Sequence, residues 1–214
     1  MKVNKLHEIA ILIDVDFLQE MILKTYNDYK AIYPTKSFDN LDLTKIIYKI
    51  ASNGRVNNKG NKVDVILYYN PEHPILPLTN KPNNIENFLE SAINQSYFST
   101  DIGNFYLHSY FSDTVGKDYK DRNAFMLQYT DGFKEILSHI VYTPSISQIV
   151  LFADNKYIND DLNKYFNNTD KLFFIENNSF ETKLQLDPIN IGKYYTINAT
   201  YIIALTMGLK YEDL

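Results

Sequence analysis

The apolar run Ile9-Ala-Ile-Leu-Ile13, followed at once by Asp14-Val15-Asp16, places the strongest constraint on how this chain folds. A continuous apolar run rich in β-branched residues is typical of a strand that is buried on both faces. In open α/β sheets, ligands bind beyond the carboxyl ends of such strands. Asp14 and Asp16 are therefore candidate site residues. The structural alternative is that Asp16 is the N-cap of a following helix.

The rest of the chain alternates between strand-like and helix-like segments. Further strands are expected at residues 63–69, 104–111, 148–153 and 172–175, and helices at 17–33, 41–52, 85–93, 122–142, 158–166 and 196–207. The proline-rich segment 71–84 and residues 177–194 are expected to be irregular, and Gly208 is expected to cap the last helix. This order predicts a three-layer α/β/α fold with a mostly parallel sheet of about five strands. Without an internal repeat or a linker, residues 1–214 are expected to form one domain.

The overall composition excludes several classes of function. With 26 acidic and 21 basic residues, the net charge of -5 argues against a broad basic surface for nucleic acid, although it allows a local basic groove. The absence of cysteine excludes disulfides, zinc-thiolate sites and cysteine nucleophiles. No stretch approaches the roughly 18 apolar residues that span a bilayer, and the N-terminus lacks the apolar core of a signal peptide. We therefore expect a soluble cytoplasmic protein.

Three segments place acidic residues where they can meet. Asp14 and Asp16 follow the first strand, Asp154 follows the fourth, and Asp131 lies on the long helix 122–142. In a doubly wound sheet, the ends of these strands can be neighbours at the switch point. Clustered carboxylates repel each other unless a cation neutralises them, and Mg²⁺ or Mn²⁺ prefers such oxygen ligands. A metal held there would polarise a phosphoryl oxygen or activate water.

Three short motifs carry a family resemblance. They are Ala10-Ile-Leu-Ile-Asp14-Val-Asp16-Phe-Leu18, Tyr129-Thr-Asp131-Gly-Phe133 and Gln148-Ile-Val-Leu-Phe-Ala-Asp154-Asn155. In this order they resemble the PIN-like nucleases, and within them the NYN branch. The resemblance implies a metal-dependent ribonuclease that cleaves single-stranded or structured RNA. Asp14, Asp131 and Asp154 would be its catalytic residues and the ligands of Mg²⁺ or Mn²⁺, supported by Asp16 and Asn155.

Two departures from the NYN pattern leave a second interpretation open. Lys156 stands where the family has another Asp, and Arg122-Asn-Ala-Phe125 lacks the Asp expected about two turns before Asp131. A member that has lost these carboxylates would be a non-catalytic module for binding or self-assembly.

A third interpretation comes from the first strand alone. The motif Asp14-Val-Asp16 also resembles the first motif of haloacid-dehalogenase-type phosphatases, in which Asp14 would be the nucleophile and Asp16 the general acid/base. Leu18 and the segment Tyr68-Tyr69-Asn70 depart from that family, which has Thr or Val and then Ser or Thr at these places.

Other residues have both a functional and a structural interpretation. Lys117, Lys120 and Arg122 are candidate phosphate contacts, although a charged loop is usually only solvated. Tyr106, Tyr110 and Phe111 are candidates for stacking on bases, with packing in the core or in a homodimer as the alternative. The four histidines (His7, His73, His108 and His139) show no ligand spacing and are expected to be structural or surface residues.

Overall fold

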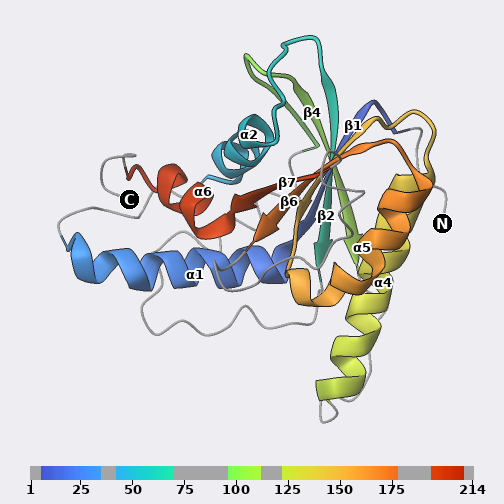
Figure 1. Ribbon diagram of the computed structural model, residues 1–214. Coiled ribbons are helices and arrows are strands. Elements are labelled where there is room, and N and C mark those ends of the chain that lie inside the picture. The colour runs from blue at the N-terminus through green and yellow to red at the C-terminus, as the bar shows by residue number, and fades with distance from the viewer. Residues whose placement is uncertain (1–5, 35–41, 70–95, 112–121, 178–193, 210–214) are drawn as a thin grey trace.

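A single twisted β-sheet organises the molecule (Figure 1). The computed structural model describes residues 6–34, 42–69, 96–111, 122–177 and 194–209. The strands are β1 (Ile9–Asp14), β2 (Lys62–Tyr69), β3 (Tyr97–Ser99), β4 (Asn104–Phe111), β5 (Gln148–Phe152), β6 (Leu172–Asn177) and β7 (Tyr194–Asn198). Their order across the sheet is β3-β4-β2-β1-β5-β6-β7. All neighbouring strands are parallel except β3 and β4.

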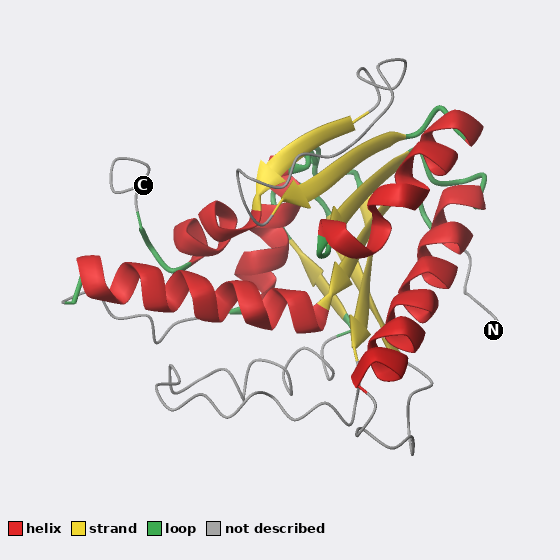
Figure 2. Cartoon of the chain, turned by 60° about the horizontal axis from the view of Figure 1, so that its bottom comes forward, coloured by secondary structure: helices red, strands yellow, loops and turns green. Residues whose placement is uncertain are grey.

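The helices cover both faces of this sheet. They are α1 (Val15–Ile32), α2 (Leu43–Asn53), α4 (Arg122–Tyr142), α5 (Asn155–Asn168) and α6 (Ala199–Thr206). Buried residues of α1, α2 and α6 form one hydrophobic core with the sheet, whereas α4 and α5 form the other. Figures 1 and 2 show these two helical layers on opposite sides of the strands. The predicted three-layer α/β/α architecture is therefore confirmed.

Strand β1 lies at the centre of the sheet, between β2 and β5. Ile9, Ile11 and Ile13 pack into the core beneath α1 and α2, and Ala10 and Leu12 pack into the core beneath α4 and α5. This double burial explains why the strand is apolar at every position. The chain leaves β1 toward β2 and later returns on the other side of β1 as β5, so the topological switch point lies between β1 and β5.

The five strands expected from the sequence are present, and the described residues add two more. One is the short antiparallel edge strand β3. The other is β7, which corrects the expected start of the last helix at residue 196. Tyr194-Tyr-Thr-Ile is rich in aromatic and β-branched residues, which favour a strand. Asn198 then caps α6, since its side chain accepts a hydrogen bond from the backbone N–H of Tyr201 at 3.1 Å.

The ends of helices α6 and α4 agree with the expectations from the sequence. Gly208 follows α6 with a φ of +83°, as expected for a glycine that ends a helix. Helix α4 ends at Tyr142, two residues before Pro144, as predicted. The expected irregular segment 71–84 and the expected helix 85–93 lie outside the described residues.

Candidate functional site

The carboxyl ends of β1 and β5 bring two of the predicted site residues to one edge of the sheet. Asp14 is the last residue of β1, and Asp154 follows β5 by two residues. The two strands are parallel neighbours in which Ile13 pairs with Phe152. Both carboxylates are buried, Asp14 being 3% exposed and Asp154 6% exposed. The expectation that these two strand ends are neighbours at the switch point is confirmed.

Asp14 also begins helix α1. Its carboxylate Oδ1 accepts a hydrogen bond from the backbone N–H of Phe17 at 3.1 Å, which makes Asp14 the N-cap. The alternative assignment of Asp16 as the cap is therefore wrong, because the helix begins at Val15, before Asp16. Asp16 instead lies in the first turn, where the helix dipole favours a negative charge.

Asp16 adds a third acidic side chain at this edge of the sheet. Burial raises the pKa of its carboxyl from 3.8 to about 6. The side chain is half-buried, so it remains within reach of solvent. Asp16 therefore carries a raised pKa close to the strand end that holds Asp14, a feature found both at functional sites and in structural networks.

Asp131 lies on α4 and is exposed. The next residue, Gly132, packs directly on Tyr68, because a Cβ on this glycine would meet the Tyr68 hydroxyl. Tyr68 in turn pairs with Asp14 across β1 and β2. The backbone of α4 therefore passes over the carboxyl end of the strands that carry the site. Asp131 therefore lies next to the point where α4 contacts Tyr68, but its own side chain is exposed.

The described residues contain no group of three His, Asp or Glu side chains arranged to hold one metal ion. Asp14 and Asp154 nevertheless supply the carboxylate oxygens that Mg²⁺ prefers, and Mg²⁺ commonly uses only one or two protein carboxylates and keeps several waters. The donor chemistry of this pair therefore fits that ion.

For the remaining predicted site residues, the structure gives at most the helix on which they lie. Asn155 is the first residue of α5 and Arg122 the first of α4. Lys117 and Lys120 lie outside the described residues.

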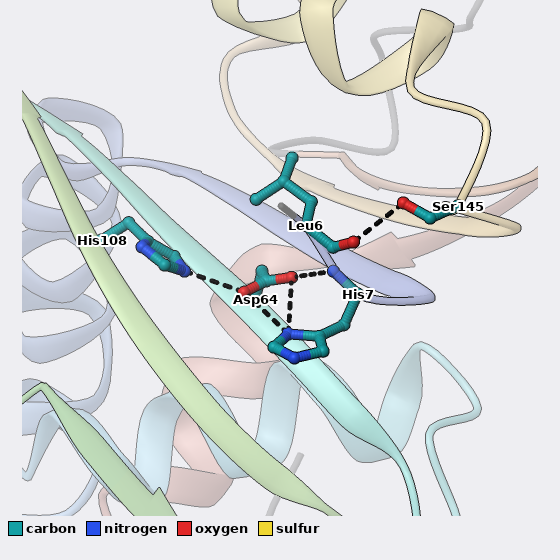
Figure 3. A network of polar contacts seen from close by, with 5 residues as sticks. All are labelled: Leu6, His7, Asp64, His108 and Ser145. Carbon is teal, nitrogen blue, oxygen red and sulfur yellow. Dashed lines mark hydrogen bonds and ion pairs between the residues drawn. The ribbon is translucent and has the colours of Figure 1, made fainter. Parts of the chain in front are cut away.

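A second polar cluster, which sequence reasoning missed, lies near the opposite end of the strands (Figure 3). Asp64 of β2 is fully buried and contacts two histidines. Its Oδ1 lies 2.8 Å from Nε2 of His108 on β4, and its Oδ2 lies 3.1 Å from Nδ1 of His7, just before β1. The backbone N–H of His7 also donates to Asp64. We call these three residues the His–Asp–His cluster.

The histidines hold Asp64 in its charged form. Burial by itself raises the pKa of the carboxyl, but the hydrogen bonds from His108 and His7 outweigh it and lower the pKa below 3.8. Aromatic rings surround the cluster: His7 stacks on Tyr106 with ring centroids 4.7 Å apart. Burial and the charge of Asp64 also raise the pKa of Tyr110 on the same strand as His108.

The sequence carried a weak signal for this cluster. Asp64 is a charged residue inside an otherwise apolar strand, and a buried carboxylate needs a partner. The partners were not recognisable, because His7 and His108 are 57 and 44 positions away and meet Asp64 only through the order of β1, β2 and β4.

Together, the strand order and the polar switch point define a doubly wound α/β protein. The chain belongs to DUF6621, a family of unknown function whose model matches residues 3–214. A search of the curated proteins found no match, and neither did a search of the solved structures. No helix in the described part of the chain is long and apolar enough to cross a membrane.

Proposed function

We propose that this protein is a divalent-metal-dependent ribonuclease of the PIN-like, NYN type. The observation that supports the proposal most directly is the position of Asp14 and Asp154 at neighbouring strand ends on the switch point. By the resemblance, they stand at two of the acidic positions of the NYN pattern, and Asp131, on the helix that packs over Tyr68, stands at a third. Lys156 and the segment Arg122-Asn-Ala-Phe125 stand where that pattern has two further Asp residues. The substrate would be single-stranded or structured RNA in the cytoplasm.

Each residue has a distinct role in this proposal. Asp14 and Asp154 would hold Mg²⁺ or Mn²⁺, which supplies Lewis-acid activation of a phosphoryl oxygen or of water when bound. The N-cap hydrogen bond from the backbone N–H of Phe17 fixes the orientation of the Asp14 carboxylate. Asp14 would therefore lose little conformational freedom on binding a metal. Asp131, exposed on α4, would be the third ligand, although the described residues do not place it in one metal-binding group with Asp14 and Asp154. Lys117, Lys120 and Arg122 would contact RNA phosphates, and Asp16 and Asn155 would support the acidic site.

The test is cleavage of a labelled single-stranded RNA by the full chain with Mg²⁺ or Mn²⁺, compared between the wild type and Asp14→Asn. Asn is as good an N-cap as Asp, so this variant keeps helix α1 and removes only the charge. Losing a metal ligand should lower the cleavage rate by about 100-fold or more. Asp28→Asn is the matched control, because Asp28 is an exposed aspartate on the same helix.

The other two interpretations predict different results. RNA binding without metal-stimulated cleavage would contradict the nuclease and favour a non-catalytic module, including one that assembles as a homodimer. Hydrolysis of an aryl phosphate that depends on both Asp14 and Asp16, without RNA cleavage, would favour a phosphatase.

A further inference from the structure

A hollow of about 530 Å³ lies at the amino ends of β1 and β2, the opposite edge of the sheet from Asp14 and Asp154. Its lining includes His7 and Glu8 just before β1, Lys62 at the start of β2, and Asn58 and Asn61 in the turn that leads into β2. A space of this size holds a small organic ligand. The nuclease proposed above uses none of these residues.

Four of the lining side chains carry polar groups that have no partner among the described residues. His7 contacts Asp64 through Nδ1, which leaves Nε2 without a partner within the described residues. The Asn58 side chain uses only its oxygen, which accepts from the backbone N–H of Gly60 at 2.9 Å. In the described part of the chain, the side chains of Asn61 and Lys62 make no hydrogen bond or ion pair either.

One acidic residue, Glu8, opposes this set of donors. It is exposed, and its Oε1 already accepts from the Ser147 hydroxyl at 3.4 Å. The amides of Asn58 and Asn61 and the ammonium group of Lys62 therefore suit a ligand with several acceptor oxygens. A phosphate group has three or more such oxygens and nearly two charges at neutral pH, whereas a carboxylate has two oxygens and one charge.

The His–Asp–His cluster prepares His7 for such a ligand. The ionised carboxylate of Asp64 accepts from Nδ1 of His7, which leaves Nε2 on the side of the ring away from Asp64. Figure 3 shows the His7 ring with Nδ1 turned toward Asp64 and its other edge turned away. Stacking on Tyr106 holds the plane of the ring.

We propose that this hollow binds a phosphate-bearing small molecule, with Lys62 Nζ and the side-chain amides of Asn58 and Asn61 donating to the phosphate oxygens and His7 Nε2 hydrogen-bonded to the same group. The groups that face His7 are Asp64 of β2, His108 and Tyr106 of β4, and Glu8 and Lys62 at the rim. Lys62 supplies the positive charge of the lining, and Glu8, which opposes it, is exposed and already accepts from Ser147.

The test is NMR of the full chain labelled with ¹³C and ¹⁵N at histidine, titrated with inorganic phosphate and with KCl at equal ionic strength and without divalent metal. The chain has four histidines, so His→Gln variants assign every resonance. The His7 signals should shift saturably with phosphate and not with KCl. His139, exposed on α4, should not respond.

Two lysine variants separate a built site from general surface charge. Lys62→Gln should weaken phosphate binding by about three- to tenfold, the loss of one charge-assisted contact. Lys59→Gln, an exposed lysine in the same turn, should leave binding unchanged. His7→Gln should likewise weaken phosphate binding, measured by calorimetry.

The proposal fails if the His7 shifts are linear in phosphate or equal to those in KCl. It also fails if the two lysine variants weaken binding equally, because the anion would then be held only by the general charge of the surface. The nuclease proposal is independent of each of these results, since the titration contains no divalent metal and no RNA.

Discussion

At the scale of single residues, Asp64 is the group on which most of the buried polar chemistry depends. It is 1% exposed, and its carboxylate joins the segment before β1 to strands β2 and β4. Hydrogen bonds to a charged group contribute about 1.5–3 kcal/mol each when they are well made. Because His7 and His108 are partly exposed, their two hydrogen bonds together should contribute to the free energy of unfolding about as much as one such bond.

Asp64 should make the stability of the protein sensitive to acid. Its folded pKa is lowered, so its contribution is present above the unfolded pKa near 3.9 and is lost as the pH falls through the folded value. Asp64→Asn should lower the free energy of unfolding by about 2–3 kcal/mol at pH 7. Urea unfolding of wild type and variant from pH 7 to pH 3 should show this difference shrinking below pH 4. A difference that stays constant over that range would contradict the assignment.

Residues at strand ends were predictable from the sequence, whereas residues that meet across strands were not. Asp14 and Asp154 each follow an apolar run, and the rule that ligands bind at the carboxyl ends of strands points to both. The His–Asp–His cluster depends on the strand order β4-β2-β1. That order is decided by the crossovers and is not visible in local periodicity, so three residues far apart in the sequence gave no common pattern.

At the scale of elements, helix α4 is placed on the sheet by a glycine. A Cβ at Gly132 would lie 2.3 Å from the Tyr68 hydroxyl oxygen and 3.2 Å from Tyr68 Cζ. The helix runs unbroken through Gly132. The glycine allows the backbone of α4 to lie against the Tyr68 side chain, which extends from β2.

Gly132→Ala should destabilise the protein, although alanine is the better helix former by about 1 kcal/mol. The added methyl group would displace Tyr68 or lift α4, at a cost of about 1–3 kcal/mol for overpacking. A double-mutant cycle with Tyr68→Phe tests this by thermal unfolding, because removing the hydroxyl should relieve part of the clash. If Gly132→Ala raises the melting temperature, the close approach does not control the docking of α4.

Most of the helices and strands could be predicted from local sequence, and there is a physical reason why β7 could not. Helix α4 was predicted at its observed bounds because it ends before Pro144. Strand β7 was missed because Thr196-Ile197 fits both a strand and the apolar spacing of the helix that follows. The distinction is made by the Asn198 N-cap and by pairing with β6. Pairing is a tertiary contact, and a single sequence does not reveal it.

At the scale of the whole molecule, the proposed metal site exists only in the folded sheet. Asp14 and Asp154 are 140 positions apart and become neighbours only when β5 pairs with β1. A metal bound by both carboxylates therefore binds the native state and not the unfolded chain. By mass action, such a ligand stabilises the fold by about 2.7 kcal/mol when its concentration is 100 times its dissociation constant.

Mg²⁺ or Mn²⁺ should accordingly raise the melting temperature of the full chain by roughly 5–10 °C at that concentration, since 1 kcal/mol shifts a protein of this size by about 2–4 °C. Calorimetry with each ion, against Ca²⁺ and against NaCl at equal ionic strength, measures the shift. Asp14→Asn and Asp154→Asn should each abolish most of it, whereas Asp28→Asn should retain it. A shift that survives both site variants would place the ion elsewhere and contradict the proposed metal site.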